Sequence, residues 1–183
     1  MAITEVIHYK DFEPKSNSHI FIDNSILLYA FAPIGNYNEK LQQSVTRFLQ
    51  SAKTIGSSFY ITSLVISEFQ NKILKDFFED FKYKNSNQKP DISLKKDYRP
   101  SETYKEDIKI LTSATNNAIK FCDRFPDDFQ QIDMKTILEN TNYCDYNDAY
   151  FIELANRKDW MIVTRDRDIL DSPYRKTKAI SFL

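Results

Sequence analysis

Four short, mostly apolar runs, separated by stretches of 13 residues or more, constrain the fold of this chain most strongly. The runs are HIFID, SFYIT, WMIVT and KAISF, at residues 19–23, 58–62, 160–164 and 178–182. Strands that are apolar on both faces are typical of a parallel sheet buried between two layers of helices. The sequence therefore predicts an α/β protein, a three-layer α/β/α sandwich with a central, mostly parallel β-sheet.

The segments between these runs show apolar residues at spacings of three and four, which predicts helices. We expect helices at 24–32, 38–53, 64–84, 103–124, 133–140 and 145–158. The first 17 residues are mostly polar and are expected to form an arm or a short edge element. We expect one domain over residues 1–183, with a polar insertion around residues 82–105.

Composition limits the classes of function. The 183 residues are 42% hydrophobic, which is enough for one domain with a real core. Only two glycines occur, and neither a phosphate-binding P-loop nor a dinucleotide fingerprint is present. The net charge of −1 does not by itself indicate a nucleic-acid-binding protein, and it leaves room for a local basic rim around an acidic pocket.

The expected location follows from the cysteines and the apolar runs. Cys122 and Cys144 form no paired metal-binding motif and fit a reduced, intracellular protein. The N-terminal segment has no apolar core of signal-peptide length, and no run approaches the length of a membrane span. We therefore expect a cytoplasmic protein without a membrane partner.

Four acidic residues occupy related places in this pattern. Asp23 ends the first apolar run, Asp166 follows the third, and Glu68 lies in the second turn of the helix after the second run. Functional crevices of open α/β sheets lie outside the carboxyl ends of the strands. Asp148 is near the start of the helix that precedes the third run, so it lies at the same edge. The sequence predicts that these four acids share one pocket.

A pocket of four carboxylates repels itself unless cations occupy it. Carboxylate oxygens suit Mg²⁺ or Mn²⁺. Zn²⁺ is disfavoured, because His8 and His19 are not at ligand spacing and no cysteine is paired with a histidine. Cations held this way activate a water molecule and stabilise a leaving oxygen, which is the arrangement for phosphodiester hydrolysis.

Each acid alone also has a structural explanation. Asp23 is a good helix N-cap, and Glu68 could be a solvated helix residue. Asp148 is favoured by the helix dipole, and Asp166 could be a loop acid paired with a neighbouring arginine. Their occurrence together, at matching topological positions, favours a metal-dependent nuclease site.

Three segments carry a family resemblance. IFIDNSILLYAF, ITSLVISEF and YNDAYFIELANRKDWMIVTRDRDIL resemble segments of the PIN-domain ribonucleases, which are similar in fold to the 5′-nucleases and flap endonucleases. The shared pattern is an Asp after the first strand, a Glu in the helix after the second, an Asp heading a later helix, and an acid after a strand that ends in Thr. The resemblance implies that Asp23, Glu68, Asp148 and Asp166 are the catalytic, metal-binding residues of an RNA-cleaving enzyme.

Further residues are expected to support the site or to bind substrate. The resemblance implies supporting roles for Thr164 and Asn24, and we assign weaker supporting roles to Asp168 and Asp145. The basic residues near the last acid are expected to contact phosphates: Arg165, Arg167, Arg175, Lys176 and Lys178. The lysines around 82–105 are interleaved with acids and fit a solvated loop better than an RNA-contacting flap.

The resemblance also implies partners, and alternatives remain. RNA is the expected substrate, and similarity to small bacterial toxins of the virulence-associated protein C type implies an antitoxin protein, although the stretch from Glu68 to Asp148 is longer than in those toxins. Aromatic residues on the helix at 64–81 would suit a homodimer. The main alternative is a catalytically inactive PIN-like fold that binds RNA or protein. A haloacid dehalogenase-type phosphatase is disfavoured, because Ser25 stands where a second Asp is needed.

Overall fold

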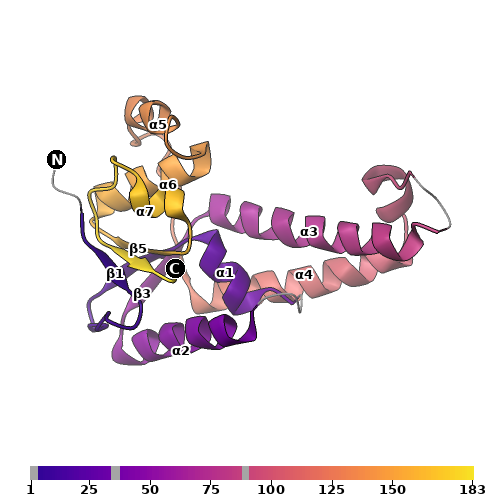
Figure 1. Ribbon diagram of the computed structural model, residues 1–183, viewed down its shortest axis with the longest axis horizontal. Coiled ribbons are helices and arrows are strands. Elements are labelled where there is room, and N and C mark those ends of the chain that lie inside the picture. The colour runs from indigo at the N-terminus through magenta and orange to yellow at the C-terminus, as the bar shows by residue number, and fades with distance from the viewer. Residues whose placement is uncertain (1–3, 34–37, 88–90) are drawn as a thin grey trace.

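Six parallel strands form one sheet in the order β1-β6-β5-β2-β3-β4, within residues 4–33, 38–87 and 91–183, which the computed structural model describes (Figure 1). The strands are β1 (Val6–His8), β2 (His19–Ile22), β3 (Ser58–Ile61), β4 (Asp123–Arg124), β5 (Met161–Thr164) and β6 (Ala179–Ser181). At the centre of the sheet, Phe21 of β2 is in register with Tyr60 of β3 and with Ile162 of β5. The parallel sheet predicted from the apolar runs is confirmed.

Helices cover both faces of this sheet (Figure 1). They are α1 (Asn24–Phe31), α2 (Glu39–Ile55), α3 (Ser63–Asn85), α4 (Glu102–Phe121), α5 (Met134–Asn140), α6 (Tyr146–Lys158) and α7 (Arg167–Asp171). One group is formed by α1 with α2, α3 and α4, and the other by α6 with α5 and α7. The three-layer α/β/α architecture is therefore confirmed as well.

Local sequence signals explain where several of these helices begin and end. The Asp23 side chain caps α1 by accepting a hydrogen bond from the backbone N–H of Ser25. The helix α2 ends at Gly56, whose φ of +98° is the left-handed conformation that glycine adopts without strain. A side chain at this position would also come within 3.4 Å of the Ser16 carbonyl oxygen.

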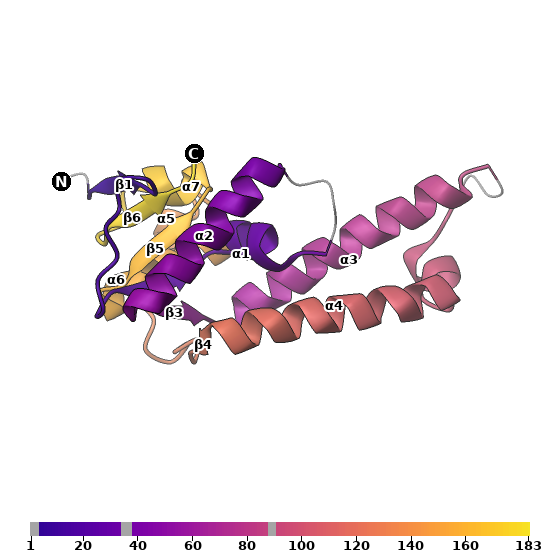
Figure 2. The ribbon, with the colours of Figure 1, turned by 90° about the horizontal axis from the view of Figure 1, so that it is seen from below.

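The helices α3 and α4 form a hairpin that projects well beyond the sheet (Figures 1 and 2). Much of the polar insertion expected at 82–105 belongs to this hairpin: it contains the end of α3, a short π-helix η1 (Leu94–Tyr98) and the start of α4. Tyr98 is fully buried against Phe78, Phe81 and Tyr104, and its hydroxyl donates to the Asp107 carboxylate at 2.6 Å. This one buried side chain anchors the connection. Residues 88–90 lie outside the described part.

The packing around Tyr98 also bears on the expected homodimer. Phe77, Phe78 and Phe81 are part-buried, and two of the three pack on Tyr98. Phe78 and Phe81 therefore contribute to the hairpin, and the homodimer stays a prediction.

The N-terminal arm contributes the edge strand β1, which pairs with β6, in line with the short edge element expected in residues 1–17. The two-residue strand β4, which ends the other edge of the sheet, was not predicted. The five-residue helix α7 was not predicted, because so short an element carries no readable periodicity. Within the described residues, no helix is both long enough and apolar enough to cross a membrane.

Candidate active site

The predicted acids meet at the carboxyl ends of the two central strands. Asp23 follows β2 directly, and Asp166 lies two residues after the end of β5. Asp148 is in the first turn of α6, and Glu68 is in the second turn of α3. The helices that follow β2 and the helix that precedes β5 lie on opposite faces of the sheet, so these strand ends form a topological switch point, where ligands of such folds bind.

A cleft of about 410 Å³ opens at this place. Five carboxylates line it, those of Asp23, Glu68, Asp145, Asp148 and Asp166. The other lining residues are Asn24, Ser25, Leu28, Asn71 and Lys72. All four acids that sequence reasoning placed in one pocket therefore line the same cleft, and two of the four expected supporting residues, Asn24 and Asp145, line it with them.

Asp23 is the most buried of the five acids, with 4% of its surface exposed. Its Oδ2 accepts hydrogen bonds from the Ser25 backbone N–H at 3.2 Å, from the Ser25 hydroxyl, and from the Thr164 hydroxyl at 2.8 Å. Burial raises the pKa of Asp23 above its ordinary value, and these hydrogen bonds oppose the rise. The same carboxylate is thus both the cap of α1 and a wall of the cleft.

Thr164 and Ser25 connect the acids to the backbone. Thr164 is fully buried, and its hydroxyl donates to Asp23 while accepting from the backbone N–H of Asp166 at 2.8 Å. The Ser25 hydroxyl accepts from the backbone N–H of Arg165 at 3.0 Å. Sequence reasoning expected Thr164 but missed Ser25. The signal was present, since a serine two residues after a capping Asp is well placed to bond its carboxylate.

Glu68 is held by a residue that sequence reasoning missed. The side-chain amide of Asn147 donates to Glu68 Oε1 at 2.5 Å. Burial raises the pKa of Glu68 to about 7, and this hydrogen bond opposes the rise. Nothing in the sequence marks Asn147 except its place beside Asp148.

Asp148 lies where the first turn of α6 meets the cleft. Asp145 is the N-cap of this helix, and its carboxylate accepts from the backbone N–H of Asp148 at 2.9 Å. Burial, followed by the negative charge of Asp145, raises the pKa of Asp148 to about 8. Without a cation, this carboxyl group therefore holds a proton at neutral pH.

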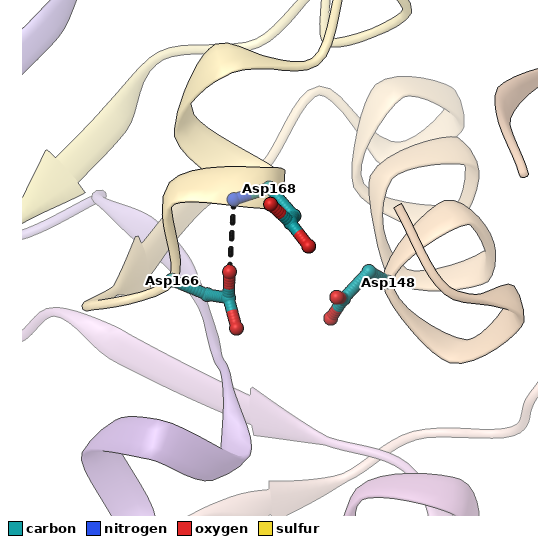
Figure 3. A group of neighbouring side chains, drawn as sticks. All are labelled: Asp148, Asp166 and Asp168. Carbon is teal, nitrogen blue, oxygen red and sulfur yellow. Dashed lines mark hydrogen bonds between the residues drawn. The ribbon is translucent and has the colours of Figure 1, made fainter. Parts of the chain in front are cut away.

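Three carboxylates come closest together (Figure 3). Asp148, Asp166 and Asp168 each offer an oxygen, and these three oxygens lie within 4.8 Å of one another. Asp166 caps α7, and its Oδ1 accepts from the backbone N–H of Asp168 at 2.8 Å. Three carboxylate oxygens at this separation fit a hard divalent cation such as Mg²⁺ or Mn²⁺. Asp168, which we expected only to support the site, thus belongs to its most compact group.

Two of the basic residues expected to contact substrate lie elsewhere. Arg175 is 5% exposed, and its guanidinium donates to backbone carbonyls, including those of Thr177 at 2.6 Å and Leu170 at 2.8 Å. Arg175 and Lys176 precede β6, so they lie towards the amino edge of the sheet, opposite the cleft. The backbone N–H of Lys176 donates there to Asn156, near the end of α6. The expectation that Arg175 and Lys176 bind substrate in the cleft is therefore wrong, and Lys178, which comes directly before β6, lies at the same edge.

The two other arginines are nearer to the acids in space. The Arg165 guanidinium lies over the Tyr29 ring and donates to the Tyr29 hydroxyl at 2.8 Å. Its Nε donates to the carbonyl of Phe182, so this side chain is already engaged by the fold. Arg167 is exposed in the first turn of α7, and its contact with substrate stays a prediction.

Comparison with known proteins places this site in a family. The sequence model of the PIN domain matches residues 20–174, so the chain belongs to the PIN-domain family. Its fold is similar to the crystal structure of VapBC2 from Rickettsia felis bound to a DNA fragment from their promoter, with a TM-score of 0.53 and 11% sequence identity over 90% of this chain and 99% of that chain. The search of curated proteins gives no match. The family resemblance inferred from the three sequence segments is thus confirmed.

Proposed function

We propose that this protein is a Mg²⁺- or Mn²⁺-dependent endoribonuclease. The observation that carries the proposal is the cleft with five carboxylates at the carboxyl edge of a PIN fold. Nucleases are the usual members of this family, and so dense a group of acids must be neutralised either by protons or by bound cations.

Some residues of the site are proposed cation ligands, and others fix these acidic ligands through hydrogen bonds. Asp148, Asp166 and Asp168 are the residues that would hold a cation most closely, and Asp23 and Glu68 would be further ligands in the cleft. A divalent cation bound there would supply the charge that stabilises the attacked phosphate and would lower the pKa of the attacking water. Hydrogen bonds from Thr164 and Asn147 fix Asp23 and Glu68 before a cation arrives, which reduces the reorganisation needed during the reaction.

Two carboxyl groups must lose protons before they act. The raised pKa values of Glu68, about 7, and Asp148, about 8, mean that part of the site is neutral at pH 7 without a cation. Cation binding would displace these protons, so the proposed site would take up cations and release protons together.

The test is RNA cleavage by matched variants. Purified protein is incubated with total cellular RNA and with Mg²⁺, Mn²⁺ or EDTA. The proposal expects cleavage that needs the cation, that Asp148→Asn abolishes and that Asp159→Asn keeps. Asp159 is a good control, because it is exposed at the other end of α6 with a φ of +54°, a conformation that Asn tolerates. Tight RNA binding without cleavage would instead favour an inactive PIN-like binding module.

The structural neighbour suggests a protein partner. Its title describes VapBC2 on a fragment of promoter DNA. We propose by analogy that this chain is the toxin of a toxin–antitoxin pair. Expression of the chain alone in bacteria should then slow growth, and the Asp148→Asn variant should not. Equal growth with both proteins would argue against a toxin.

A further inference from the structure

One basic side chain lines the acidic cleft among the described residues. Lys72 shares this surface with the five carboxylates and with Asn71. It lies four residues after Glu68 on α3, which places both side chains on the same face of the helix. A positive charge is thus built into the rim of a cleft that is otherwise acidic.

The ammonium group of Lys72 forms only a weak ion pair in the structure. The Lys72 Nζ lies 2.5 Å from Asp76 Oδ1 on the next turn of α3, and the two side chains are 46% and 27% exposed. Exposed ion pairs between residues four apart contribute little to stability, because water and salt screen them. Lys72 can therefore exchange Asp76 for another anion at small cost.

We infer that Lys72 is a substrate-binding residue whose ammonium group contacts a phosphate of the RNA strand in the cleft. The inference rests on the proposed function, from which it takes RNA as the ligand. A strand that enters the cleft brings one negative charge per nucleotide past five carboxylates. Cations neutralise the acids at the floor, whereas phosphates beside the reacting one need a fixed positive charge at the rim.

The chemistry of the side chain suits this role. Lysine presents a compact charge on a flexible stem, so it can follow a phosphate without demanding one geometry. Contacts of this kind position a strand and carry no sequence information. Lys72 should thus contribute to affinity for RNA of any sequence, and Asp76 should compete with the phosphate for it.

The experiment measures the binding of a fluorescein-labelled, single-stranded RNA of mixed sequence by anisotropy in Mg²⁺. All variants are made in the Asp148→Asn background, where cleavage does not interfere. Lys72→Ala should weaken binding about tenfold and reduce the slope of log affinity against log salt by about 0.7, the value for one phosphate contact to a single strand. Lys72→Arg should keep most of the affinity, and Asp76→Asn should increase it only when Lys72 is present.

Lys109→Ala is the matched control. It removes one exposed lysine from α4, outside the cleft, and so makes the same change in net charge. We expect a less than twofold effect. Equal losses in Lys72→Ala and Lys109→Ala, or no RNA binding by the parent protein, would overturn the inference. Wild-type protein that binds RNA through Lys72 but never cleaves it would refute the nuclease proposal alone, and cleavage without a Lys72 effect on binding would refute this inference alone.

Discussion

We predict that the carboxyl group of Asp148 destabilises the folded protein when no cation is bound. Its pKa rises from an ordinary 3.8 to about 8 on folding, so a buried carboxyl group must either keep a proton or carry an unfavourable charge. The loss in the free energy of unfolding is about 1.4 kcal/mol for each pH unit above the unfolded-state pKa. At pH 7, which is roughly three units above it, the loss before solvent screening is therefore about 4 kcal/mol. Because Asp148 is only part-buried, solvent screening reduces this figure. We expect Asp148→Asn to stabilise the cation-free protein by about 1–2 kcal/mol.

The pH dependence gives this prediction its sign. A raised acid pKa means that the penalty is absent below the unfolded-state pKa of 3.8, grows as pH rises, and levels off above about 8. The gain from Asp148→Asn at pH 5 should therefore be roughly a third of the gain at pH 7. Thermal unfolding in EDTA measures it, and the melting temperature at pH 7 should rise by about 2–8 °C.

The same melting experiment also provides a control variant, Asp159→Asn, and a result that would contradict the prediction. Adding Mn²⁺ should raise the melting temperature of the wild type and of Asp159→Asn, and should raise that of Asp148→Asn by less, because this variant keeps the other acids but lacks one ligand and so binds the cation more weakly. If Asp148→Asn melts at or below the wild-type temperature in EDTA at pH 7, burial of this carboxyl group does not carry the cost that its surroundings imply.

Three other predictions follow from contacts of the site and of the fold. Thr164→Val should lower the free energy of unfolding in urea by about 1–3 kcal/mol and reduce cleavage, because Asp23 and the Asp166 N–H lose a buried partner; unchanged stability would contradict this. Arg175→Ala should lower the free energy of unfolding by about 2–4 kcal/mol but leave the affinity for RNA unchanged in the folded fraction, and a weaker affinity there would restore Arg175 as a substrate contact. Calorimetric affinity for Mn²⁺ should fall from pH 8 to pH 6 with proton release on binding, because Asp148 must ionise, and a flat profile would count against its role as a ligand.

Much of the site could be predicted because, in a parallel sheet, the position of a residue relative to a strand determines at which edge of the sheet it lies. Each strand delivers the residue after it to the same edge, so Asp23 and Asp166 had to lie together once β2 and β5 were recognised. The same rule places Arg175 and Lys176 at the opposite edge, since the chain must return there before β6 begins. Closeness in sequence to Asp166 was the wrong guide to these two residues.

Other parts of the site depend on how the helices are oriented and on which atoms their side chains can contact, and a single sequence does not specify these. Helical spacing places Lys72 on the same face of α3 as Glu68, but only the packing of α3 brings its side chain to the cleft, and its neighbours in the sequence carry both signs of charge. Asp168 joins Asp148 and Asp166 because a five-residue helix turns the chain back at once after β5. The bond from Asn147 to Glu68 likewise needs two helices in a fixed mutual position.

The acids Asp23, Asp145 and Asp166 are also the N-caps of α1, α6 and α7. Asparagine caps a helix about as well as aspartate does, since the cap needs an oxygen and not a charge. One substitution at such a position can therefore remove the charge and keep the shape. If the proposed activity holds, a lineage built on this arrangement can lose it by one substitution while the folded surface remains, and binding alone can then be selected.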